Sequence, residues 1–93
     1  MNFEWNEAKN KVNREKHGIW FEEARSVFAD DLARVFYDPE HSEDEERFIV
    51  IGMSSSSRLL MVVHCYREEG VIVRIISARK STKKERLEYE ERI

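Results

Sequence analysis

Cations inside an apolar segment indicate a binding site for an anion. Residues 71–80 are rich in β-branched side chains and resemble a largely buried strand, yet they include Arg74 and end on Arg79 and Lys80. A guanidinium in a buried strand needs an anionic partner or a cleft. The sequence therefore predicts a cationic site at the end of this strand.

A histidine and a phenol in the preceding strand are candidates for proton transfer. Alternation along residues 59–66 places His64 and Tyr66 on one face, and alternation along 71–80 places Arg74 on one face. In the simplest register the helices cover the other face of both strands, so these three side chains gather in one cleft. Such a cleft could stabilise extra charge on phosphorus and transfer protons during phosphodiester cleavage.

The same residues could instead have purely structural roles. His64 could be a hydrogen-bonded core residue, and Arg74 could pair with a carboxylate such as Glu46. A second histidine, His17, could simply end a helix, where it interacts favourably with the helix dipole. Parity also places Arg79 on the opposite face from Arg74 unless a bulge intervenes at residues 77–78.

Charge is distributed unevenly along the chain. The net charge of −3 argues against nucleic-acid binding, but six of the acids lie within residues 38–46, and without them the sum is +3. The bases gather on both sides of this acidic loop, at Lys9, Lys11, Arg14 and Lys16 and again at Arg79, Lys80, Lys83, Lys84 and Arg86.

Composition places the chain among cytoplasmic proteins. The longest apolar run, 59–63, is too short to span a bilayer, and the first residues do not resemble a signal peptide, so no membrane association is expected. The single cysteine, Cys65, cannot form an internal disulfide. No Cys or His spacing suggests a metal, and neither metal nor cofactor is expected.

The length suits one domain spanning residues 1–93, and the hydrophobic pattern predicts an α+β fold. Short connections between the last four strands predict an antiparallel meander. Two helices before it should cover one face, and a capping box at Thr82 and Glu85 should open a short final helix. The expected elements are strands at 3–5, 33–37, 47–53, 59–66 and 71–80, and helices at 7–16, 21–28 and about 83–93.

An ordered series of short motifs resembles the BrnT family of type II toxins nearly end to end. The motifs are Phe3-Glu4-Trp5, Lys16-His17-Gly18, Phe21-Glu22-Glu23-Ala24, Asp38-Pro39-Glu40-His41, Glu46-Arg47-Phe48, Ile51-Gly52, Arg58-Leu59-Leu60, the segment 74–80, Glu85 and Tyr89. The resemblance implies a RelE-like fold and an RNA-cleaving growth inhibitor. It also implies neutralisation by a ribbon-helix-helix antitoxin, BrnA, that represses its own operon.

The resemblance and the charge pattern together suggest a set of site residues. Arg74 and Arg79 are expected to hold the phosphate and stabilise transition-state charge, with His64 and Tyr66 completing the catalytic group. The expected RNA-binding residues are Lys16, His17, Arg47, Arg58, Lys80 and Lys83.

Two functions follow as hypotheses. The first is a metal-independent endoribonuclease toxin whose substrate is RNA and whose protein partner is a BrnA-like antitoxin. Operator DNA would be contacted only through that antitoxin, and a toxin dimer within a heterotetramer is one compatible assembly. The second is a noncatalytic protein-binding module, in which the sheet face and the acidic loop attract a basic partner.

Overall fold

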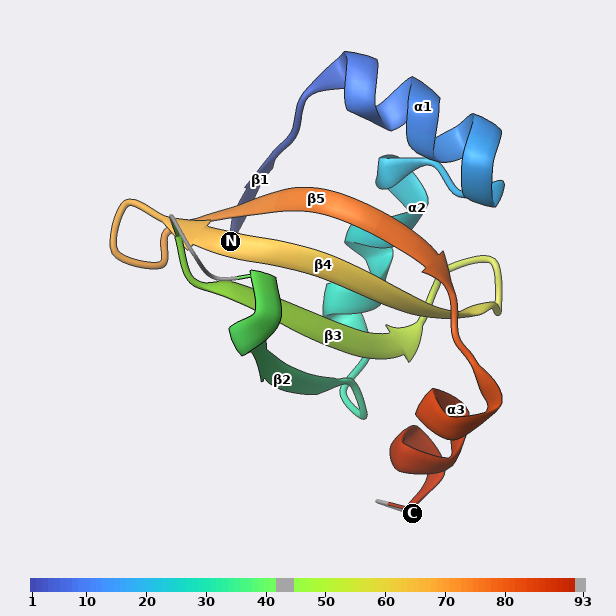
Figure 1. The fold of residues 1–93 in the computed structure, drawn as a ribbon. Helices are drawn as coiled ribbons and strands as arrows, with labels where there is room; N and C mark the ends of the chain where they lie inside the picture. The colour runs from blue at the N-terminus through green and yellow to red at the C-terminus, as the bar shows by residue number, and fades with distance from the viewer. Residues whose placement is uncertain (42–44, 92–93) are drawn as a thin grey trace.

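A mixed five-stranded sheet organises this computed structural model, which describes residues 1–41 and 45–91 (Figure 1). The strand order is β1-β5-β4-β3-β2. In chain order the elements are β1 (Asn2–Glu4), α1 (Glu7–His17), α2 (Phe21–Ser26), the 3-10 turn η1 (Val27–Ala29), β2 (Arg34–Asp38), the 3-10 turn η2 (Pro39–His41), β3 (Arg47–Met53), β4 (Leu59–Arg67), β5 (Ile72–Lys80) and α3 (Lys83–Glu90). The predicted α+β class is confirmed.

The predicted meander is also confirmed, because β2, β3, β4 and β5 pair antiparallel in sequence order. The sheet is not wholly antiparallel, however. β1 pairs parallel with β5, with Phe3 opposite Val73. A parallel pair needs a long crossover connection, and here nearly the whole chain lies between the two strands.

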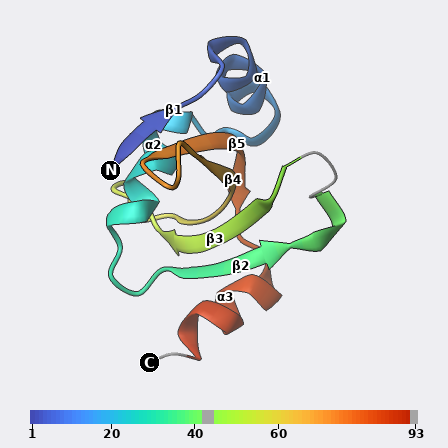
Figure 2. The same cartoon turned by 90° about the vertical axis from the view of Figure 1, so that its left-hand side faces the viewer.

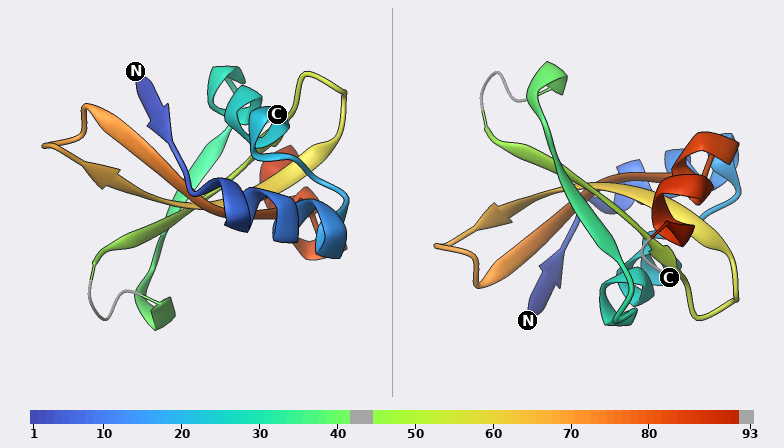
Figure 3. Two further views of the ribbon diagram at one scale, coloured as in Figure 1. Left: turned by 90° about the horizontal axis from the view of Figure 1, so that it is seen from above. Right: turned by 90° about the horizontal axis from the view of Figure 1, so that it is seen from below.

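Helices α2 and α3 lie on opposite sides of the sheet (Figure 3). α2 and η1 cover one side, which we call the α2 face (Figure 2). There Phe21 and Val27 join a core with Leu60 and Val62. On the opposite side, the α3 face, Tyr89 packs with a second apolar cluster formed by Ile51, Leu59 and Met61. α1 lies beside β5, at the far end of the sheet from β2 (Figure 1).

A bulge in β5 decides which of its side chains share a face. Val63 pairs with Ser77, but the next residue, His64, pairs with Ile75, so Ile76 has no partner on β4. The extra residue shifts the alternation and brings Arg79 onto the same face as Arg74. The bulge therefore lies at residue 76, one position before the predicted one.

The final helix docks on the sheet. Both hydrogen bonds of the predicted capping box between Thr82 and Glu85 are present. The Tyr89 hydroxyl donates to Asp30 Oδ2 at 2.7 Å, and its ring is buried. The helix ends at Glu90, and residues 92–93, where its end was predicted, lie outside the described residues. No helix among the residues described is long and apolar enough to cross a membrane.

Candidate functional site

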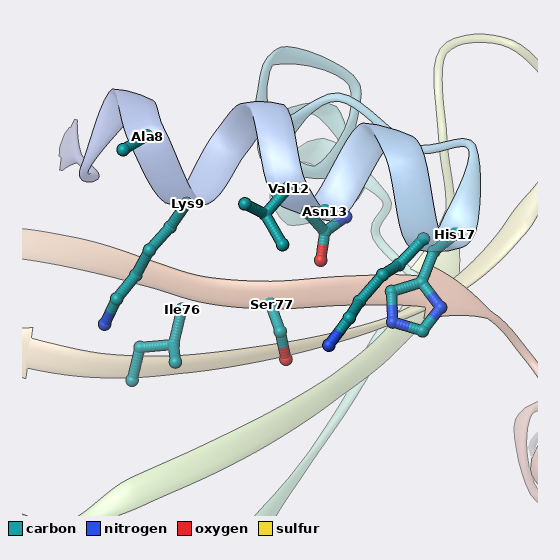
Figure 4. Close-up of a pocket in the computed structure, with 8 residues that line it drawn as sticks. Ala8, Lys9, Val12, Asn13, His17, Ile76 and Ser77 are labelled. Carbon is teal, nitrogen blue, oxygen red and sulfur yellow. The ribbon is translucent and has the colours of Figure 1, made fainter.

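A groove between α1 and β5 brings basic side chains together (Figure 4). Its volume is about 300 Å³, and its lining residues are Ala8, Lys9, Val12, Asn13, Lys16, His17, Ile76 and Ser77. Lys9 and His17 extend from α1 past the strand, on the side where Ile76 and Ser77 lie (Figure 4). Ser77 pairs with Val63 on the α3 face, so the groove opens toward that face.

Local sequence explains why these side chains share one side of α1. Positions 12, 13 and 16 follow position 9 by three, four and seven residues, which places all four on one side of a helix. Asn6 caps the start of α1, and Gly18 ends it at φ 73°, a left-handed conformation that glycine adopts without strain. His17 therefore occupies the last turn.

The side chain of Asn13 holds α1 against β5. Its Nδ2 donates to the carbonyls of Ile19 and Ala78, both at 2.9 Å, and its Oδ1 accepts from the Ala78 N–H at 3.0 Å. The amide thus pairs with the free edge of the strand as a neighbouring strand would. This contact fixes the distance across the groove.

The groove is positively charged. Within residues 1–41 and 45–91, no carboxylate forms an ion pair with Lys9, Lys16 or His17. Lys9 and Lys16 are thus cations without a carboxylate partner among the described residues in one groove, and such cations attract a polyanion such as a nucleic-acid backbone.

Arg74 and Arg79 lie on the α3 face on either side of Ser77, and each is held by a carboxylate. Arg74 Nη1 is 2.8 Å from Glu4 Oε2, which also lies 3.0 Å from Arg67 Nε. The alternative prediction that Arg74 pairs with a carboxylate is therefore confirmed, but the carboxylate is that of Glu4 and not that of Glu46. Arg79 donates to both oxygens of Glu85, at 2.9 and 2.8 Å.

The two arginines share a face without converging. Their partners on β4 are Cys65 for Arg74 and Met61 for Arg79. Those partners are four positions apart along β4, roughly 13 Å at about 3.3 Å per residue. Arg74 is held by Glu4 and Arg79 by Glu85, so in this conformation the two guanidinium groups do not share one anion.

The prediction that His64 and Tyr66 share a face with Arg74 is wrong. His64 is paired with Ile75 on the α2 face and is 0 % exposed, with its ring 4.9 Å from that of Phe28. Its Nε2 lies 3.2 Å from the Tyr66 hydroxyl. Burial lowers the pKa of His64, which favours the neutral imidazole. Neither residue lines the groove.

The sequence pattern of β4 could not predict which of its faces the helices cover. Leu60 and Val62, which precede His64 on the α2 face, are apolar, and so are Leu59 and Met61 on the other face. A strand with two apolar faces has no pattern that selects the covered side.

The other predicted RNA-binding residues are dispersed. Arg58 donates to Glu23 through Nε at 2.9 Å and through Nη2, and this hydrogen bonding lowers the pKa of Glu23. Arg47 is on the α3 face, 3.9 Å from Glu45. Lys80 pairs with Leu60 and so belongs to the α2 face, whereas Lys83 is exposed in the first turn of α3. Only Lys16 and His17 of the predicted set line the groove.

Lys9 and Ser77 are polar lining residues that the predicted set of site residues omitted. Lys9 lies seven positions before Lys16 on the same side of α1, so helical periodicity could have found it. Ser77 reaches the groove beside the bulge, which local sequence does not reveal. Among the residues described, no group of three or more His, Cys, Asp or Glu side chains could hold a metal ion.

Comparisons with known proteins give the family. Residues 5–85 match the model of the family described as ribonuclease toxin, BrnT, of type II toxin-antitoxin systems. The fold is similar to the crystal structure of the Brucella abortus ribonuclease toxin BrnT, with a TM-score of 0.68 and 24% identity over 89% of this chain and 99% of that one. A search of curated proteins found no match. The chain thus belongs to the BrnT family of ribonuclease toxins of type II toxin-antitoxin systems.

Proposed function

We propose that this ribonuclease toxin binds the RNA backbone in the groove between α1 and β5 and cleaves it there without a metal ion. The supporting observation is the convergence of Lys9, Lys16 and His17 on one groove with no carboxylate paired to them among the described residues. Metal-free cleavage of RNA needs cations for the phosphate and a group that accepts a proton. The groove offers both.

In this mechanism the RNA 2′-hydroxyl attacks the adjacent phosphorus. The bond from O2′ to phosphorus forms, the bond from phosphorus to O5′ breaks, and the products carry a 2′,3′-cyclic phosphate and a 5′-hydroxyl. His17 accepts the proton of the 2′-hydroxyl, and water supplies a proton to the leaving O5′. Lys9 and Lys16 stabilise the charge that builds on the phosphate oxygens.

Arg74 and Arg79 would bind phosphates on either side of the cleaved one. Their side chains flank Ser77 on the α3 face, toward which the groove opens. Each is now paired with a carboxylate, Glu4 or Glu85, so RNA binding exchanges one anion for another. A guanidinium suits this exchange because it can donate two parallel hydrogen bonds to either anion.

The toxin would act in the cytoplasm as a single domain, residues 1–93. A BrnA-like ribbon-helix-helix antitoxin would neutralise it and would also contact operator DNA. A toxin dimer within a heterotetramer is the assembly proposed for the neutralised complex.

Alanine variants of Lys16 and His17 test the mechanism. Each should lower kcat/KM for cleavage of single-stranded RNA by about 100-fold, the lower end of the range for a proton-transfer group or a charge-stabilising donor. Lys11→Ala is the matched control, because Lys11 is an exposed base on the same helix that does not line the groove. Cleavage should persist in EDTA.

Two results would contradict the proposal. One is cleavage at the wild-type rate by both Lys16→Ala and His17→Ala. The other is loss of cleavage in EDTA that returns when a divalent metal is added.

A further inference from the structure

Aromatic side chains form an uncovered surface on the α2 face, at the β2 end of the sheet. The ring of Phe48 lies 5.6 Å from that of Tyr37 and 5.2 Å from that of Tyr66. Val35 continues this row along β2, and Val35, Tyr37 and Tyr66 are 52%, 52% and 39% exposed. We call these four residues the aromatic strip. Adjacent exposed apolar side chains of this kind mark interaction sites.

The strip borders an open edge of the sheet. β2 is the outermost strand at the end remote from α1 (Figure 2), and among the residues described no strand pairs with its outer side. Alternate residues of an edge strand direct their backbone N–H and C=O groups away from the sheet. An extended peptide can pair with such an edge and place side chains over the adjoining face.

The charge beside the strip is negative. Glu40 follows β2, and Glu45 and Glu46 precede β3; all three side chains are exposed. No cation among the described residues pairs with Glu40 or Glu46. These carboxylates repel an RNA backbone and attract a basic peptide, whereas the basic groove lies across the sheet beside β5.

We propose that the aromatic strip and the outer edge of β2 are the docking surface for a basic, apolar segment of the antitoxin, which pairs with β2 as an added strand. Family membership supplies the existence of an antitoxin, and the assignment of RNA to the opposite end of the sheet rests on the proposed function. Docking here anchors the antitoxin. Another part of the antitoxin chain must then reach the groove to block RNA.

The double variant Val35→Lys with Tyr37→Lys tests the surface. Both side chains are half exposed, and lysine there repels a basic segment and removes apolar contact. The probe is the antitoxin co-expressed from the toxin's own operon and then purified. Affinity should fall by roughly 30-fold or more, as for loss of an interface hot spot. RNA cleavage by the free variant should be unchanged, and toxicity in cells should no longer be neutralised.

Two further variants keep the result interpretable. Val71→Lys, which alters a similarly exposed apolar residue in the turn between β4 and β5, should change neither affinity nor cleavage. Glu40→Lys with Glu46→Lys should slow antitoxin association and weaken its salt dependence, since rim charges act chiefly on the encounter rate. This pair leaves the apolar strip intact, so it tests the surface even if the first double variant fails to fold.

The outcomes separate the inference from the proposed function. Wild-type antitoxin affinity in both double variants would overturn the docking surface. Loss of RNA cleavage with intact antitoxin affinity would also overturn it, because the strip would then be a platform for stacking RNA bases. A wild-type toxin whose cleavage does not depend on Lys16 or His17 would contradict the proposed function alone.

Discussion

Burial determines the role of the His64 side chain. The imidazole lies beneath Phe28 and Phe48 and beside the Tyr66 hydroxyl, and it is 0 % exposed. If Nδ1–H donates to the Val62 carbonyl, 3.2 Å away, Nε2 is free to accept from Tyr66. The neutral ring then satisfies both nitrogens, whereas an imidazolium would have a desolvated charge.

His64 should therefore make stability depend on pH. Burial lowers the folded-state pKa of His64 below the ordinary value of 6.5, so below that value the unfolded state binds more protons. The free energy of unfolding should fall as the pH drops from about 6.5 toward the folded-state pKa, and this contribution should be constant above 6.5. His64→Phe should remove it while keeping an aromatic ring in place. Urea denaturation across this range provides the measurement, and an unchanged slope in the variant would refute the assignment.

The side chain of Asn13 ties α1 to the sheet. The helix has exposed residues on most of its surface, and Asn10 and Asn13 are its buried positions. Buried asparagines contribute hydrogen bonds rather than apolar area, so their geometry sets where the helix lies. The groove depends on this placement because Lys9, Lys16 and His17 all project from α1.

Asn13→Ala should loosen α1 and lower the free energy of unfolding by about 2–4 kcal/mol, because it leaves buried groups of Ile19 and Ala78 without their hydrogen bonds. Chemical denaturation measures the loss. Lys11→Ala, at an exposed position of the same helix, should change stability by less than about 0.5 kcal/mol. A small effect at Asn13 would mean that other contacts hold the helix.

Positive and negative side chains gather at different ends of the sheet. The net charge of −3 would repel RNA if it were spread evenly. Instead, basic side chains line the groove beside β5, and exposed carboxylates lie near β2. The Debye length at physiological ionic strength is about 8 Å, so RNA in the groove is influenced mainly by the nearby cations.

RNA affinity should accordingly depend on salt concentration because of the lysines that line the groove. For an RNA that lacks the reactive 2′-hydroxyl, log Kd should rise with log salt concentration, and each lysine that contacts a phosphate should contribute about 0.7 to the slope. Lys9→Ala with Lys16→Ala should reduce the slope by about 1.4. Fluorescence anisotropy at several salt concentrations measures it. A slope equal to that of wild type would exclude both lysines from phosphate contact.

Contacts between near neighbours in the chain were enough to predict the elements and the side chains that α1 presents. Asn6 and Gly18 set the ends of α1, the capping box opened α3, and the spacing of Lys9 and Lys16 placed them on one side of a helix. These features depend on neighbours in the chain. The order of apolar runs and short turns was likewise enough to predict the antiparallel meander.

Which side chains meet depends on contacts between segments that are distant in the chain. β4 is apolar on both faces, so its pattern could not show that the helices cover His64. The bulge at Ile76, which brings Arg79 onto the face of Arg74, exists only as a mismatch between two strands. The groove combines α1 with residues of β5 some sixty positions later in the chain. Strand pairing and helix docking are non-local, and the packing energy that selects them is absent from any single segment.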